Sequence, residues 1–153
     1  MVARRPGACR LFDGLDWPNG IGFSPDGRTL YACDYHAGHV IAHAVDAAGD
    51  VSSRRVFWRS PSGDVDGLAV DERGGVWVAL GRGGGVARVG PGGVLERVLD
   101  VPAGFVASCS FGGVDRRDLY IATQDNTDDP ARGGTLFRVR VDVPGLPPPL
   151  ATV

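Results

Sequence analysis

Two polar residues occupy matching places in this sequence, each directly before a glycine. Asn19 lies in the run PNGIGF and Asp66 in the run VDGLAV, so each precedes a short apolar stretch that is typical of a β-strand. An amide oxygen together with a carboxylate suits a hard cation such as Ca²⁺, Mg²⁺ or Mn²⁺, and can also accept Zn²⁺. Both residues are therefore candidate metal ligands. The alternatives are an Asn-Gly turn without a ligand role for Asn19, and a cap at the start of a strand for Asp66.

These two runs belong to a repeat. The segments 18–34, 65–80 and 107–123 each begin with a polar or small residue and continue as a short apolar strand. Each then passes through a turn that contains Asp or Gly into a second strand with an aromatic residue near its start. Matching positions recur after 47 and then 41 residues. A repeat of this length, built of strands with period-2 alternation, is typical of propeller blades.

Each repeat leaves room for further strands, and no helical periodicity of useful length is present. These strands are expected at 39–45, 52–58, 85–89, 94–101 and 134–143. The sequence thus predicts an all-β fold: a partial β-propeller with about three blades of four antiparallel strands, half of a six-bladed ring. Within a single domain at 1–153, we expect an outer strand of a missing blade at 9–15, blades at 17–60 and 64–102, an incomplete blade at 105–143, and a Pro-rich tail at 144–153.

Strand direction brings further residues to the candidate site. If the inner strand of each blade starts at the end that bears Asn19 and Asp66, the second strand returns to that end. The loops 34–38, 81–85 and 124–134 would then share this end of the molecule. The alternative is that their polar residues are ordinary loop residues. The candidate substrate-binding residues in these loops are Asp34, His36, Arg82 and Asn126.

Composition excludes several classes of protein. All 16 basic residues are Arg, so a Walker-type phosphate loop and Schiff-base lysine chemistry are excluded. A net charge of −2 gives no basic field for nucleic acid. No apolar run approaches the ~20 residues of a membrane span, and no apolar signal-peptide core follows the first arginines. The three cysteines lack metal-site spacing, which indicates free thiols and a cytoplasmic protein.

Other motifs that could carry chemistry are weak. His39 and His43 would lie about 13 Å apart along one strand, too far to share an ion. The glycine run at 81–85 precedes a strand, and so lacks the helix N-terminus of a dinucleotide loop. The run DNTDDP has too few ligands for an EF-hand. Neither G-x-S-x-G nor H-E-x-x-H occurs.

Four runs in one order resemble the C-terminal half of the regucalcin, gluconolactonase and luciferin-regenerating enzyme family. They are PNGIGFSPDGRTLYACD, VDGLAVDERGGVWVAL, ASCSFGGVDRRDLYIAT and GGTLFRVRVDVPGLP, and the resemblance extends over residues 11–147. Members of that family are six-bladed propellers with one divalent metal ion in the central channel, and several hydrolyse sugar lactones. The resemblance implies that Asn19 and Asp66 are metal ligands and that Asp66 is also the catalytic base.

The resemblance therefore implies a metal-dependent hydrolase of a small sugar lactone or similar cyclic ester. The metal would polarise the carbonyl and acidify a water molecule, and Asp66 would accept the proton. The family's third ligand, a Glu of the first blade, has no counterpart here, nor do its substrate-holding Arg and Asn. Ala107 and Ser108 stand at the matching place of the third repeat. The alternatives are a non-catalytic half-propeller that binds a metal, a ligand or a protein partner, and one piece of a split or mis-started reading frame.

Three blades alone leave two open flanks, and we expect each flank to be an apolar wall that needs a partner. The strands at 9–15 and 134–143 would also leave unpaired edges. A homodimer, or pairing with an upstream half-propeller, would restore six blades. A second copy would supply Asn19 and Asp66 twice around one channel, and with them four oxygen-bearing groups.

Overall fold

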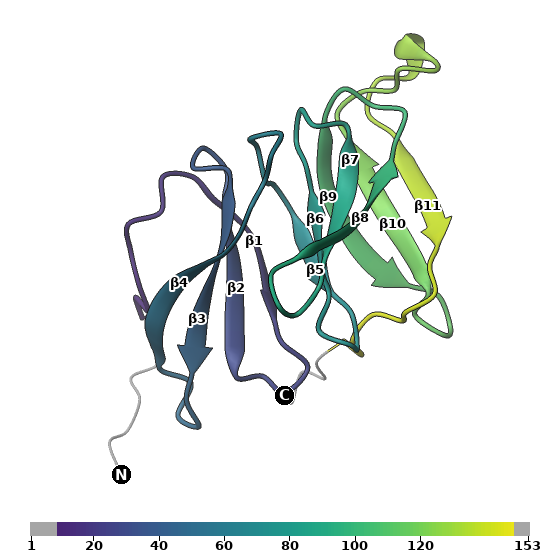
Figure 1. Cartoon of the computed structure of the whole chain (residues 1–153). Helices are drawn as coiled ribbons and strands as arrows, with labels where there is room; N and C mark the ends of the chain where they lie inside the picture. The colour runs from purple at the N-terminus through teal and green to yellow at the C-terminus, as the bar shows by residue number, and fades with distance from the viewer. Residues whose placement is uncertain (1–8, 149–153) are drawn as a thin grey trace.

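A computed structural model describes residues 9–148, which form three antiparallel sheets (Figure 1). A single 3₁₀ turn, η1 (Pro130–Arg132), accounts for the helical structure in this part of the chain. The first sheet has the order β1 (Pro18–Phe23), β2 (Thr29–Asp34), β3 (His39–Val45) and β4 (Val51–Arg59). The second has β5 (Leu68–Val70), β6 (Val76–Ala79), β7 (Gly85–Val89) and β8 (Leu95–Asp100). The third has the order β11 (Leu136–Arg140), β10 (Asp118–Thr123) and β9 (Val106–Gly112).

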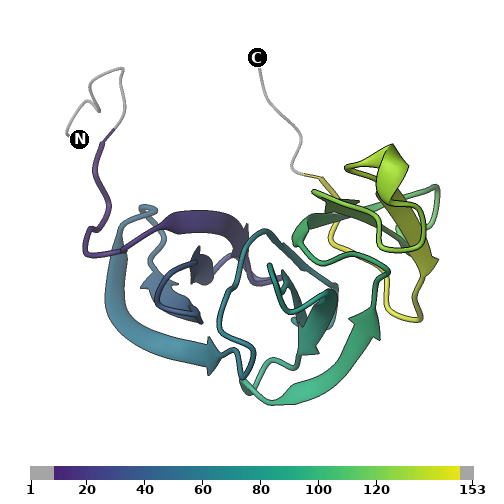
Figure 2. The same cartoon turned by 90° about the horizontal axis from the view of Figure 1, so that it is seen from above.

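The three sheets stand side by side as blades. The inner strands β1, β5 and β9 are neighbours, whereas β4 and β8 lie along the outer, convex side (Figure 2). Within each sheet, consecutive strands pair antiparallel, as in up-and-down blades. Short turns join them, except for the longer loop with η1 between β10 and β11. The all-β partial propeller that the repeat predicts is confirmed. No helix among residues 9–148 is long and apolar enough to cross a membrane.

Two apolar clusters fill the spaces between neighbouring blades. Because successive side chains of a strand point to opposite faces, β6 contributes to both clusters. Val76 and Val78 pack in the cluster shared with the first sheet, whereas Trp77 and Ala79 pack in the cluster shared with the third. All four are fully buried. The alternation of β6 therefore fixes the central blade against both of its neighbours.

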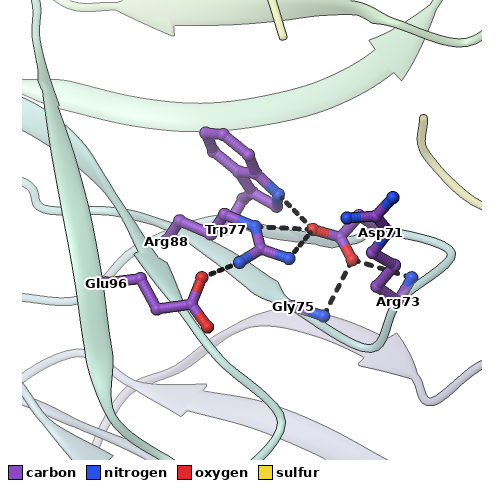
Figure 3. Close-up of polar contacts among 6 residues, drawn as sticks. All are labelled: Asp71, Arg73, Gly75, Trp77, Arg88 and Glu96. Atoms are coloured by element: carbon purple, nitrogen blue, oxygen red, sulfur yellow. Dashed lines mark hydrogen bonds and ion pairs between the residues drawn. The ribbon is translucent and has the colours of Figure 1, made fainter. Parts of the chain in front are cut away.

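A buried carboxylate organises the turn between β5 and β6. Asp71 is inaccessible to solvent, and Arg88, which binds it, also pairs with Glu96 (Figure 3). This network lies at the opposite end of β5 from Asp66, so it holds the blade together far from the candidate site. The groups that donate to the Asp71 carboxylate are the backbone N–H of Arg73 and of Gly75, Nε1 of Trp77, and the guanidinium of Arg88.

Residues 9–15, for which the sequence predicts an outer strand, form no strand in the structure. A strand needs a neighbour for its backbone groups, and the blade expected to supply one is not among residues 9–148. The segment runs instead along the first sheet. The Phe12 ring stacks on His43 of β3, with ring centroids 4.2 Å apart. Arg54 of β4 donates to the backbone carbonyls of Asp13 and Gly14.

The two outer faces of the molecule differ in chemistry. The free face of the first sheet is apolar, with Ile21, Phe23 and Val56 exposed on it. The expectation of an apolar wall is wrong for the third sheet, because its free face is mostly polar: Tyr120 and Leu136 are the large apolar side chains on it. The other residues of that face are Ser108, Ser110, Gly112, Asp118, Ala122, Arg138 and Arg140.

Candidate functional site at the start of the inner strands

Asn19 and Asp66 lie at the same end of adjacent inner strands. Asn19 is the second residue of β1, and Asp66 comes two residues before β5. The backbone N–H of Gly20 donates to the carbonyl oxygen of Asp66 at 3.1 Å, and the N–H of Gly67 donates to Ala107 at 2.9 Å. Direct backbone hydrogen bonds therefore join all three blades at the positions that the repeat aligns.

The close approach of the blades explains why a glycine follows each candidate ligand. A Cβ atom on Gly20 would lie 2.4 Å from the backbone nitrogen of Leu68 and 2.7 Å from the carbonyl oxygen of Asp66. A Cβ atom on Gly67 would lie 2.7 Å from the Cα of Ser108. Real side chains do not tolerate such distances. The glycines are thus required by packing between blades, and the polar residue before each remains free for another role.

The two candidate ligands differ in exposure. Asn19 is exposed, whereas Asp66 is 8% exposed. Burial, and secondarily the negative charge of Asp64, raises the pKa of the Asp66 carboxyl. The backbone hydrogen bonds between β5 and β6 continue to Asp66, whose N–H donates to the carbonyl oxygen of Ala79 at 2.8 Å. Asp66 is therefore held by its backbone while its side chain is largely withdrawn from water.

The register places the predicted loops at this same end. Pro18 is paired with Asp34, so the loop after β2 lies beside the start of β1. Asp66 bonds to Ala79, and Val106 is paired with Thr123, which brings the loops after β6 and β10 to the same end. Polar side chains from all three blades therefore gather around the starts of the inner strands.

Sequence reasoning missed a polar cluster that links two of these loops. The Asp64 carboxylate accepts a hydrogen bond from Tyr35 Oη at 3.0 Å and pairs with Arg82 Nε at 2.9 Å. Tyr35 belongs to the first blade and Arg82 to the second, so Asp64 bridges them. Arg82 is still exposed on this surface. The signal in the sequence was an acidic residue two positions before Asp66, in a loop that the repeat leaves undefined.

Aromatic rings form a row beside this cluster. Trp17 contacts His36 with ring centroids 5.1 Å apart, His36 contacts Tyr35 at 5.3 Å, and Tyr35 stacks with Phe105 at 6.3 Å. The His36 ring also lies near a carboxylate, with Nδ1 3.4 Å from Asp16. His36 and Trp17 are exposed. The row therefore offers flat apolar surface at the same end as the candidate ligands.

Two of the predicted substrate-binding residues have structural partners. Asp34 is buried and accepts the backbone N–H groups of Asp16 and Trp17, which fixes the chain before β1. Burial alone would raise its pKa, but these hydrogen bonds outweigh it and lower the pKa of Asp34. Asn126 is also buried, and its hydrogen bonds stay within its own loop. Its Nδ2 donates to Thr135 Oγ1, and its Oδ1 accepts the backbone N–H of Asp128. A role for either residue in substrate binding stays a prediction.

The donors of this chain fall short of a complete metal cage. Residues 9–148 contain no group of three or more His, Cys, Asp or Glu side chains that could hold an ion. Asn19 and Asp66 supply two oxygen-bearing side chains, whereas Ca²⁺ takes six to eight oxygen ligands. Their chemistry fits a hard cation, but their number does not, so binding by these residues would need further donors.

The two buried cysteines are unreactive. Cys33 and Cys109 are free, and burial raises the pKa of both thiols, that of Cys109 to about 12. A thiol in this state is not a nucleophile at neutral pH. Both residues pack between blades as small apolar groups.

Comparison with known proteins assigns this architecture. The family described as "SMP-30/Gluconolactonase/LRE-like region" matches residues 3–125. A pentonolactonase of Haloferax volcanii is 35% identical over 88% of this chain and 50% of its own length, and regucalcin of Danio rerio is 34% identical over 91% and 51%. The solved structure of "a calcium-binding protein, regucalcin" from Agrobacterium tumefaciens superposes with a TM-score of 0.82 at 27% identity, covering 94% of this chain and 52% of that one.

The chain thus spans about half the length of the curated relatives that it matches. Its three blades correspond to part of a six-bladed propeller, and the relatives include several named lactonases. The matched region extends from the segment before the first blade into the third blade and includes both Asn19 and Asp66. On these grounds the chain belongs to the SMP-30/gluconolactonase/LRE-like family.

Proposed function

We propose that this chain forms part of a hydrolase that opens a small sugar lactone or a similar cyclic ester. The relatives named as a pentonolactonase, a 6-deoxy-6-sulfogluconolactonase and an L-arabinolactonase support this substrate class. The observation that carries the proposal is the hydrogen bond from Gly20 to Asp66, because it sets Asn19 beside Asp66 at the end where the loops of three blades gather.

In this proposal Asp66 is the general base. It accepts a proton from the water molecule whose oxygen bonds to the lactone carbonyl carbon. The bond between that carbon and the ring oxygen then breaks, and the ring oxygen takes the proton from Asp66 to become the hydroxyl group of the open-chain acid. Asp66 is held rigidly through its backbone, which keeps its carboxylate in place during the attack. Arg82 and His36 lie on the exposed surface of the same end, where they can donate hydrogen bonds to sugar hydroxyls.

A divalent ion enters this proposal only with donors from outside residues 9–148. Asn19 and Asp66 are the oxygen donors that this chain would contribute. The relative described as a calcium-binding protein supports such an ion, and its identity among Ca²⁺, Zn²⁺, Mg²⁺ and Mn²⁺ is a matter for titration. The free, buried thiols Cys33 and Cys109 support our placing the protein in the reducing cytoplasm.

Hydrolysis of gluconolactone, followed by acid release, tests the proposal. Asp66→Asn preserves the size of the side chain and removes the base, so we expect kcat to fall by about 10²–10⁴-fold with a smaller change in KM. Asp142→Asn is the matched control, because Asp142 is exposed at the opposite end of the third blade. EDTA should abolish turnover if an ion takes part. A preparation that binds Ca²⁺ or a lactone without any turnover would instead support the non-catalytic alternative.

A further inference from the structure

The third sheet has a free outer edge. The other two sheets have four strands each, whereas the third ends at β11, which pairs only with β10. The backbone groups of residues 136–140 that point away from β10 are thus available for another strand. No residue between 9 and 148 of the same chain takes that place.

The same chain holds an extended segment without a sheet. Residues 9–15 form no ladder, although their run CRLFDGL has the length of an outer strand. They lie over the free face of the first sheet, through the stacking of Phe12 on His43. Leu30 and Ile41 of that face are fully buried, yet they belong to neither cluster between blades. The segment therefore covers a face suited to a neighbouring blade.

We propose that two copies of this chain close one six-bladed ring, in which residues 9–15 of each copy add to β11 of the other as its fourth strand. Three blades from each copy would together make the six blades of one ring, and this chain matches about half the length of its relatives. The exchange is mutual, so a two-fold axis closes the ring and completes both open sheets.

Apolar side chains on both free faces would meet in this pairing, although the free face of the third sheet is mostly polar. Exposed Ile21, Phe23 and Val56 lie on the free face of the first sheet, and Tyr120 and Leu136 lie on that of the third. When residues 9–15 move to the partner's β11, these apolar side chains come together and replace the cover of Leu30 and Ile41. The contact removes apolar surface from water on both copies.

Charge also matches across this contact. Arg138, at the centre of β11, is an exposed cation. The segment that would pair with this strand carries Asp13, which lies 3.7 Å from Arg10 of the same segment and whose side chain is 79% exposed, so it can turn to Arg138 instead. An Arg and an Asp on adjacent strands form a favourable cross-strand pair.

The pairing would also bear on the candidate site. Resting on the proposed function, a second copy brings a second Asn19 and a second Asp66 to the same channel, which doubles the two oxygen-bearing side chains of one chain. Ca²⁺ binding by calorimetry should then follow the dimer and be lost in a monomeric variant. The pairing itself is measured without activity, so its failure is distinguishable from a failure of the proposed hydrolase.

Light scattering on the full chain measures the pairing. We expect a monodisperse species at twice 16.0 kDa. Leu136→Asp should convert it to a folded monomer, because Leu136 is 77% exposed in the single chain and would be buried in the ring. Val114→Asp is the matched control, since Val114 is fully exposed in the turn after β9, and it should leave the dimer intact. A stable monomer, an aggregate, or a dimer unaffected by Leu136→Asp would each overturn the proposal.

A thiol cross-link tests the strand exchange itself. Cys9 is exposed, and Arg138→Cys places a second accessible thiol on β11, while Cys33 and Cys109 are buried. A short bis-maleimide should then join two chains of this variant in high yield. Val114→Cys should give little covalent dimer under the same conditions. A cross-link formed only within one chain, or equally in both variants, would show that residues 9–15 do not pair with the partner's β11.

Discussion

The backbone N–H of Gly20 and the carbonyl oxygen of Asp66 form a hydrogen bond between two blades. It lies directly beside the two side chains proposed as metal ligands, Asn19 and Asp66. The backbone positions of these two residues are therefore fixed by direct contact between the blades. This geometry depends on the absence of a Cβ atom at the residue that follows each of them.

Gly67→Ala should destabilise the protein. Its Cβ atom would meet backbone and side-chain atoms of Ser108 at 2.3–2.7 Å, so the second and third blades would have to separate locally. We expect the free energy of unfolding in urea to fall by about 1–3 kcal/mol. Gly92→Ala is the control, because a Cβ atom at Gly92 meets nothing within 4 Å. Equal effects of the two substitutions would contradict the account of close contact between blades.

Asp71→Ala should be more damaging than any surface acid. It removes the acceptor for four donor groups at once. The buried guanidinium of Arg88 would then keep Glu96 as its remaining carboxylate partner. Breaking a buried pair in this way costs about 3–5 kcal/mol of unfolding free energy. Asp26→Ala is the comparison, since Asp26 serves the corresponding turn of the first blade but is exposed, and should change stability little. Similar losses for both variants would argue against the buried network as the cause.

Arg82→Ala should weaken substrate binding more than catalysis. Arg82 is anchored by Asp64 while its side chain remains 73% exposed beside the candidate site. If it binds a sugar hydroxyl, its loss should raise KM by about tenfold and leave kcat nearly unchanged, because the same contact exists in the ground state and the transition state. Arg117→Ala, in the exposed turn between β9 and β10 at the opposite end, should change neither constant. A fall in kcat alone would assign Arg82 a role in the chemical step instead.

The sequence could predict the blades because the signals for them are local. Alternation, turns and a repeat length define β3 and β7 to the residue, at 39–45 and 85–89. The cluster around Asp64 was missed because its contacts join residues 18 and 29 positions apart in loops of different blades. The behaviour of residues 9–15 depends on a neighbouring sheet, and no local pattern shows whether that neighbour is present.

The chemistry of the two open flanks could not be predicted from alternation alone. The period of two identifies which residues of β9 and β10 share a face, but it does not say which face packs against the second blade. The structure places Cys109, Leu119 and Ile121 on the packed face, which leaves the serines of β9 on the free face. The roles of Asn19 and Asp66 remain predictions, because packing between the blades accounts for the glycines that follow them.

His43 should make stability depend on pH. It is 4% exposed, and its Nε2 has no hydrogen-bond partner among residues 9–148. Burial, and secondarily the positive charge of Arg54, lowers the pKa of His43 below its usual value of about 6.5. The neutral ring is thus favoured in the folded state, where it stacks on Phe12.

The sign of the effect follows from proton binding. Above about pH 6.5 the ring is neutral in both states, and its full contribution to stability is present. As the pH falls below that value the unfolded chain takes up a proton first, so the free energy of unfolding should decrease. Urea titrations at several pH values should show this loss, and His43→Phe, which keeps a flat ring but removes the titrating group, should reduce it. A slope unchanged by His43→Phe would place the acid sensitivity in the carboxylates instead.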